Sequence, residues 1–302
     1  MGDIKLFRIN GGTVSEIDGR GVALEKSLQN LFEANLPALV GVRLLASEFS
    51  TTHGGRIDTL GIDENNCPVI IEYKRSSNEN VVNQGLFYLD WLMDHRRDFE
   101  WLVLEKLGET AAKSVEWSAP RLICIAGDFN KFDVHAVNQM NRNIELIRYV
   151  RFDNDLLLLD LLTATAQTNP TGQLTSGNGS SASRSKTVLE FISDADSDTQ
   201  ELWSSIQAYL LALGDDVQER HLKFYIAFKR IKNFACIQVH PQDRRIRAHL
   251  KVNPDEVELE NGFTRDVRNV GHYGTGDLEV TISTTADFER AKPLFERSYD
   301  AS

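Results

Sequence analysis

Alternating apolar and polar residues mark two adjacent strands in the first half of the chain, at residues 56–62 and 68–74. The Asp-Glu-Asn-Asn segment between them consists of residue types that tolerate the backbone angles of a tight reversal. We therefore expect a β-hairpin. Because successive side chains on a strand point to opposite faces, Glu72 and Lys74 share one face of the second strand.

The other apolar periodicities complete a mixed pattern. Apolar residues recur at helical spacing over residues 23–36 and again up to Leu92, and a continuous apolar run of strand length covers residues 121–126. The expected order is β-β-β-α-β-α-β, an α/β mixed sheet with helices on its faces. The further expected elements are strands at 4–9, 42–49, 144–152 and 156–161 and helices at 98–106 and 132–140.

A polar tract at residues 164–186 divides the chain. It consists mainly of Ser, Thr, Gly and Asn and buries too little apolar surface to offset the entropy of ordering, so we predict a flexible linker. The linker separates a domain at 1–163 from a small α+β domain at 187–302. The second domain is expected to contain helices at 199–213 and 287–299 and strands at 217–228, 234–240, 245–252 and 278–282.

Composition indicates the compartment. The chain has 302 residues, of which 41% are hydrophobic and 25% charged, typical of a soluble globular protein. Because it has neither an apolar run of about twenty residues nor an N-terminal signal sequence, we expect a cytoplasmic protein without a membrane partner. The three cysteines are odd in number and far apart, which favours neither a disulfide framework nor a zinc site.

Candidate chemistry clusters around the predicted hairpin. Folding it brings Asp58 beside Glu72, with Lys74 on the same face as Glu72. Gln84 and Tyr88 lie four residues apart on the next predicted helix and share one side of it. We expect an acidic pocket with a cation at its edge. The alternative is a solvated salt-bridge cluster, which requires no function.

These residues resemble the PD-(D/E)XK nuclease superfamily, whose fold is restriction-endonuclease-like. Asp58, the Glu72-Tyr73-Lys74 triplet and Gln84-x-x-x-Tyr88 look like its RecB-like variant with the QxxxY motif, and most of all like the catalytic domain of the NucS (EndoMS) endonucleases. An early-helix glutamate of that family corresponds to Glu25. The resemblance covers roughly residues 22–162, and the proline of the family name is Ile57 here.

The resemblance implies a divalent-metal-dependent endonuclease that hydrolyses phosphodiester bonds of DNA. Asp58 and Glu72 would ligate Mg²⁺ or Mn²⁺, and Glu25 would add a ligand or hold a coordinated water. Lys74 would orient the attacking water and offset charge on the scissile phosphate. Glu33 is the competing inward-facing acid, and only the family spacing favours Glu25.

The same resemblance assigns supporting roles to Gln84 and Tyr88, next to the lysine and the bound strand. A second hypothesis retains the nuclease fold without turnover, as a nucleic-acid-binding or sensing module. The second domain resembles a small domain of unknown function that follows nuclease-like domains in bacterial proteins, and this likeness carries no site residues. A homodimer is left open.

Charge favours a partner surface in the second domain. The net charge of −11 argues against nonspecific coating of nucleic acid, yet residues 220–251 carry nine Lys and Arg against one acid, Asp243. Four aromatic residues among them suggest base stacking: Phe224, Tyr225, Phe228 and Phe234. The alternative is an amphipathic strand set with solvated cations. Candidate nucleic-acid contacts are Arg56, Lys223, Lys229, Arg230, Lys232, Arg245 and Arg247.

Overall fold

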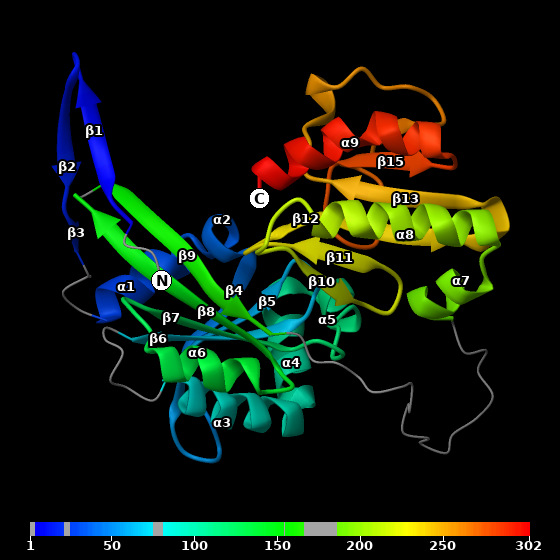
Figure 1. Cartoon of the computed structure of the whole chain (residues 1–302). Coiled ribbons are helices and arrows are strands. Elements are labelled where there is room, and N and C mark those ends of the chain that lie inside the picture. The colour runs from blue at the N-terminus through cyan, green and yellow to red at the C-terminus, as the bar shows by residue number, and fades with distance from the viewer. Residues whose placement is uncertain (1–3, 21–24, 75–80, 154, 166–185) are drawn as a thin grey trace. The chain divides into compact units, whose positions relative to one another are not determined.

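The computed structural model describes residues 4–20, 25–74, 81–153, 155–165 and 186–302. The chain divides into two compact units, Met1–Gln167 and Thr168–Ser302 (Figure 1). Almost all of the predicted linker at 164–186 lies outside the described residues, as does the beginning of the helix that ends near Leu92.

The first unit is a mixed α/β structure. Among its described residues seven strands form one sheet in the order β3-β8-β7-β6-β5-β4, with β9 also paired to β8. The β6–β7 and β7–β8 pairs are parallel and the other pairs antiparallel. The strands are β1 (Leu6–Asn10), β2 (Thr13–Ile17), β3 (Gly19–Arg20), β4 (Val42–Ser50), β5 (Arg56–Asp63), β6 (Pro68–Lys74), β7 (Arg121–Ala126), β8 (Asn143–Phe152) and β9 (Leu156–Ala164).

Helices cover both faces of this sheet. On one face α3 and α4 contribute Leu92 and Phe99 to a core that includes Ile70 and Leu122 from the strands. On the other, the ring of Phe32 from α1 packs edge-on against Tyr73 at 5.7 Å between centroids. The helices of this unit are α1 (Glu25–Glu33), α2 (Leu36–Val40), α3 (Val81–Asp94), α4 (Arg96–Leu107), α5 (Glu109–Lys113) and α6 (Lys131–Asn138).

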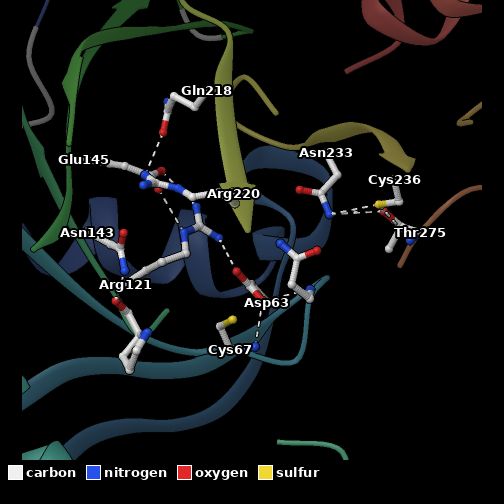
Figure 2. A network of polar contacts seen from close by, with 12 residues as sticks. Asp63, Cys67, Arg121, Asn143, Glu145, Gln218, Arg220, Asn233, Cys236 and Thr275 are labelled. Carbon is white, nitrogen blue, oxygen red and sulfur yellow. Dashed lines mark hydrogen bonds and ion pairs between the residues drawn. The ribbon is translucent and has the colours of Figure 1, made fainter. Parts of the chain in front are cut away.

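A buried ion-pair triad joins the strands β5, β7 and β8 at the end where β7 begins. Arg121 Nη1 lies 2.9 Å from Asp63 Oδ2, and Arg121 Nη2 lies 2.8 Å from Glu145 Oε2 (Figure 2). Burial lowers the pKa of Arg121, but the two carboxylates outweigh it and raise the pKa. The triad fixes one end of the sheet, and the candidate site occupies the opposite end of β6.

The hairpin at 56–74 and the strands after it confirm the predicted pattern. The helix expected over residues 23–36 ends earlier, because Pro37 in the first turn of α2 has no N–H to continue it. The strand at 4–9 has a partner that the pattern did not predict: β1 pairs with β2 through Gly11 and Gly12, whose positive φ angles of 53° and 87° suit a two-residue hairpin turn.

The second unit is a six-stranded antiparallel sheet over its described residues, in the order β10-β11-β12-β13-β15-β14. The helices α8 and α9 run alongside its strands (Figure 1). Its elements are α7 (Val188–Asp194), α8 (Ser197–Leu211), β10 (Gln218–His221), β11 (Ile226–Lys229), β12 (Asn233–His240), η1 (Pro241–Asp243), β13 (Arg245–Leu250), η2 (Pro254–Glu256), β14 (Thr264–Asp266), β15 (Leu278–Ile282) and α9 (Thr285–Asp300).

The α+β character expected of this unit is confirmed, with two differences. The single strand predicted at 217–228 is a hairpin, β10 and β11, because the chain reverses where Leu222 N–H donates to the Tyr225 carbonyl at 3.0 Å. The helix α7 was not predicted. It begins at a capping box in which Thr187 and Glu190 satisfy each other's backbone N–H groups.

Candidate active site

Two carboxylates take the place of ladder hydrogen bonds where β5 and β6 separate. The last backbone pair of these strands toward this end is Thr59 with Ile71. Beyond it, Glu72 Oε1 accepts a hydrogen bond from Asp58 N at 3.2 Å, and Asp58 Oδ2 accepts one from Tyr73 N at 3.1 Å. The predicted meeting of Asp58 and Glu72 is confirmed, and each acid is fixed by the opposite strand.

Glu72 is fully buried at 0% exposure. Burial raises its pKa to about 8, and the nearby charge of Asp58 raises it in the same direction. Its second oxygen, Oε2, has no hydrogen-bond partner among the described residues. Burial also raises the pKa of Asp58, against the lowering effect of the Tyr73 N–H and of Lys74. Burial thus favours the protonated form of the Glu72 carboxyl.

Lys74 and Glu25 form the cationic edge of this cluster. Lys74 Nζ lies 3.0 Å from Glu25 Oε1, and the Lys74 side chain is largely buried. Glu25 is the first residue of α1, a helix whose Phe32 is buried beside Tyr73 of β6, so packing of this helix brings the carboxylate to the strand end. The lysine belongs to the same group of charges as Asp58 and Glu72, because it lowers the pKa of both acids.

The motif helix α3 supplies Tyr88 and Gln84. The hydroxyl of Tyr88 accepts from Arg56 N at 3.0 Å and from Gln84 Nε2 at 3.3 Å. Tyr88 thereby fixes the start of β5, two residues before Asp58. Gly55 lies directly against this ring, and a Cβ there would come within 2.8 Å of the Tyr88 hydroxyl.

Gln29 and Glu33 on α1 complete the support of β5. The buried Gln29 amide donates to the Asp58 carbonyl at 2.8 Å and to Glu33 Oε1 at 2.9 Å. Glu33 Oε1 accepts from Thr59 Oγ1 at 2.6 Å. Glu33 does face inward, as the competing hypothesis held, but it contacts Thr59 rather than Lys74. The sequence did not single out Gln29, because its position beside the apolar stripe of Leu28 and Phe32 predicts a helix residue and no particular role.

The donor set fits a cation only in part. Within the described ranges no group of three or more His, Cys, Asp or Glu side chains is arranged to hold a metal ion. Asp58 and Glu72 supply hard carboxylate oxygens, one of them without a hydrogen-bond partner in the described structure. Magnesium in phosphoryl-transfer sites commonly uses one or two carboxylates together with substrate oxygens and water. The two acids therefore fit such an ion, while Glu25 is engaged by Lys74.

The basic stretch at 220–251 is less accessible than its composition indicated. Lys229 is buried, and Arg230 Nε lies 2.7 Å from Asp216 Oδ2 while its guanidinium covers the Tyr299 ring at 4.7 Å. In the first unit Arg56 forms a 3.0 Å ion pair with Glu48. Lys229 is thus the buried candidate, and the others remain at least partly exposed: Arg56, Lys223, Arg230, Lys232, Arg245 and Arg247.

The aromatic residues proposed for base stacking are mostly core residues. Phe228 and Phe234 are fully buried in the apolar cluster of the second unit, and Tyr225 is buried as well. Only Phe224 is partly exposed, with its ring 4.8 Å from that of Tyr273. The stacking interpretation is therefore wrong for the buried three, since alternation along a strand does not reveal which face the helices cover.

No helix in the described part of the chain has the length and apolar character needed to cross a membrane.

Residues 188–302 match a family model described as "Domain of unknown function (DUF5655)". Among solved structures, a repair endonuclease from Pyrococcus abyssi aligns over 42% of this chain and 48% of its own, at 21% identity and a TM-score of 0.29. That TM-score is too low to establish a shared fold.

One relative matches this chain almost from end to end. An uncharacterized protein of Haemophilus influenzae is 32% identical over 302 residues, which cover 98% of this chain and 99% of the relative. Both units therefore occur together in that protein, in the same order. The second part of the chain is similar to the DUF5655 family model, and the chain as a whole belongs to the family of this uncharacterized Haemophilus influenzae protein.

Proposed function

We propose that the chain is a divalent-metal-dependent DNA endonuclease whose first unit has a PD-(D/E)XK, restriction-endonuclease-like fold. The observation that carries the proposal is the fully buried Glu72, held beside Asp58 with one carboxylate oxygen lacking a hydrogen-bond partner in the described residues. A solvated salt-bridge cluster would expose its acids, and burial of an incompletely paired carboxylate costs stability. Such a cost is typical of a functional site.

Asp58 and Glu72 would hold the cation, which would supply Lewis-acid polarisation of the scissile phosphate. The Lys74 ammonium, kept in place by Glu25 at 3.0 Å, orients the attacking water and offsets negative charge on the phosphate. Tyr88 keeps the first strand in position through the Arg56 N–H. In this proposal Glu25 holds Lys74 in place and is not a third metal ligand.

The test of activity is nicking of supercoiled plasmid DNA with Mg²⁺ or Mn²⁺. Lys74→Gln removes the ammonium, and we expect it to lower the nicking rate by about 10²-fold or more, the usual loss when one electrostatic group is deleted. Lys106→Gln, on the exposed surface of α4, is the matched control and should nick like the wild type. Nicking by Lys74→Gln at the wild-type rate would refute the assignment.

The test of the metal ligands is thermal melting with and without Mn²⁺. Asp58→Asn keeps an acceptor for the Tyr73 N–H but loses the charge, so Mn²⁺ should raise the Tm of the wild type and not that of this variant. Asp90→Asn, exposed on α3, is the control. Since the cation must displace the Glu72 proton, Mn²⁺ affinity should rise with pH up to about 8 and then level off.

A second candidate is a nucleic-acid-binding module without turnover. It is favoured by one observation: among the described residues no three acidic, His or Cys side chains form a group suited to a metal. This candidate predicts DNA binding that is independent of metal and no nicking under any metal tested. Metal-dependent nicking that Lys74→Gln abolishes would exclude it.

A further inference from the structure

The sheet of the second unit has two unlike faces. On one face the strands present apolar side chains to α8 and α9, and these side chains form the core with Trp203 and Phe295. Ile246, Ala248 and Leu250 of β13 belong to this core. Because side chains alternate along a strand, the residues between them point to the other face.

The other face is polar, and we call it the polar face. Its central strand, β13, contributes Arg245, Arg247 and His249 in a row. Side chains two residues apart on a strand are spaced about 7 Å. The flanking strands add residues opposite this row in the ladder: His240, Gln238 and Cys236 from β12, and Thr281 and Glu279 from β15. Arg265 of β14 lies opposite Glu279.

The polar face carries more positive than negative charge. Arg247 is half-buried at the centre of this row. Burial lowers the pKa of His240, and the charge of Arg247 lowers it further. Glu279 is the acid of the central ladder, and its Oε1 lies 3.9 Å from Arg265 Nη1. The charge of Arg247 also lowers the pKa of Glu279, so this one carboxylate faces the cations Arg245, Arg247 and Arg265.

His249 is a polar side chain buried in this face. It is 1% exposed, and its Nδ1 has no hydrogen-bond partner in the described residues. Its Nε2 lies 3.4 Å from Glu279 Oε2, and this contact lowers the pKa of Glu279. The ring of His272 stacks on His249 with 4.4 Å between centroids and 13° between planes. Because both ring nitrogens are shielded from solvent, His249 supports this face from beneath the His272 ring.

The loop that carries His272 is fixed on this side of the sheet. Thr275 N–H lies 3.4 Å from the sulfur of Cys236, and Asn233 Nδ2 lies 3.3 Å from Thr275 Oγ1 (Figure 2). Gly274, at a φ of +84°, approaches Cys236 so closely that a Cβ would collide with it. These interactions keep His272 over His249, so the polar groups are preorganised rather than gathered by a ligand.

We propose that the polar face, centred on Arg247 and Arg245, binds the phosphodiester backbone of DNA. The inference rests on the proposed function for its choice of ligand. A row of cationic side chains along a strand suits a linear polyanion, and its spacing is on the order of the distance between adjacent phosphates in one nucleic acid strand. This DNA-binding surface does not include Lys229, which is buried, or Arg230, which is ion-paired with Asp216.

The test is binding of a short fluorescent DNA, single-stranded and duplex, to the full chain in EDTA across a salt series. Arg247→Gln should weaken binding and reduce the slope of log affinity against log salt by about 0.7 to 0.9 for each phosphate that the variant no longer neutralises. Arg247→Lys keeps the charge and should retain the slope. Arg297→Gln, exposed on α9 among the helices of the opposite face, is the matched control.

The outcomes separate this inference from the proposed function. A lower slope for Arg247→Gln with an unchanged Tm and an unchanged Arg297→Gln supports the polar face, whether or not the protein nicks plasmid. Equal slopes for both variants, or no binding of either DNA form in EDTA, would overturn it and leave the nicking result untouched. A preference for single strands over the duplex would place bases as well as phosphates on this face.

Discussion

Glu72→Gln replaces the buried carboxyl by an amide of the same shape. The amide oxygen still accepts from Asp58 N, and the amide NH₂ takes the place of Oε2. The substitution therefore resembles the protonated carboxyl that burial favours. We expect the variant to be more stable than the wild type in EDTA, and inactive in plasmid nicking. A stabilising change at a proposed ligand is the signature of a site that costs the fold stability.

The magnitude follows from the pKa. A carboxyl with a pKa of 4.5 in the unfolded chain and about 8 in the folded chain binds more protons when folded. Its penalty is absent below about pH 4.5, grows as pH rises and is complete above about pH 8. At 1.36 kcal/mol per pKa unit the full penalty is about 5 kcal/mol, and at about pH 6 it is about 2 kcal/mol. The advantage of Glu72→Gln should therefore grow by about 3 kcal/mol between about pH 6 and about pH 9.

The assay is urea unfolding in EDTA at these two pH values, followed by the fluorescence of the tryptophans of the first unit. Trp91 is buried in its core and reports on that unit. Glu109→Gln, a substitution on the exposed α5, should leave the pH dependence unchanged. The reasoning would be refuted if the stability difference between Glu72→Gln and the wild type were the same at both pH values. Ionisation of Glu72 would then cost the folded protein nothing, and the burial of Glu72 would not support a functional site.

Three further substitutions test the surroundings. Tyr88→Phe leaves the Arg56 N–H without its acceptor, so we expect it to lower the free energy of unfolding by about 1–3 kcal/mol and to slow nicking. The Mn²⁺-induced rise in Tm should persist, and its loss would make Tyr88 part of the metal site. Arg121→Met removes the cation from two buried carboxylates and should lower the free energy of unfolding, measured in urea, by about 3–5 kcal/mol. An unchanged free energy of unfolding would mean that the triad is hydrated. Gly85→Ala places a Cβ against Leu122 and should cost about 1–3 kcal/mol, and an unchanged midpoint would show that β7 yields there.

The meeting of the two acids could be predicted because it depends on local rules. Strand alternation and a short turn place Asp58 opposite Glu72 whatever the rest of the chain does. The part played by Glu25 came from the family resemblance, since nothing in its own helix distinguishes it from Glu33. Which of the two reaches Lys74 depends on how α1 docks on the sheet, and helix docking is a long-range property.

The same limit explains the errors in the second unit. The strands at 226–229 and 233–240 contain aromatic and basic residues that fit a reader of nucleic acid as well as a core. Phe228 and Phe234 are core residues because α8 and α9 cover their side of the sheet. The sequence of a strand shows that it has two faces, and only the position of the helices decides which one is buried.

The separation of β5 and β6 has a consequence for how relatives of this chain are judged. Asp58 and Glu72 each accept a hydrogen bond from a backbone N–H of the opposite strand, so their oxygens serve the sheet even where no reaction occurs. A relative that has lost catalysis would still gain stability by keeping an acceptor at both positions, and asparagine or glutamine would serve. The presence of acceptors at these positions in a relative therefore reports on sheet integrity, and a negative charge at both is the feature that reports on chemistry.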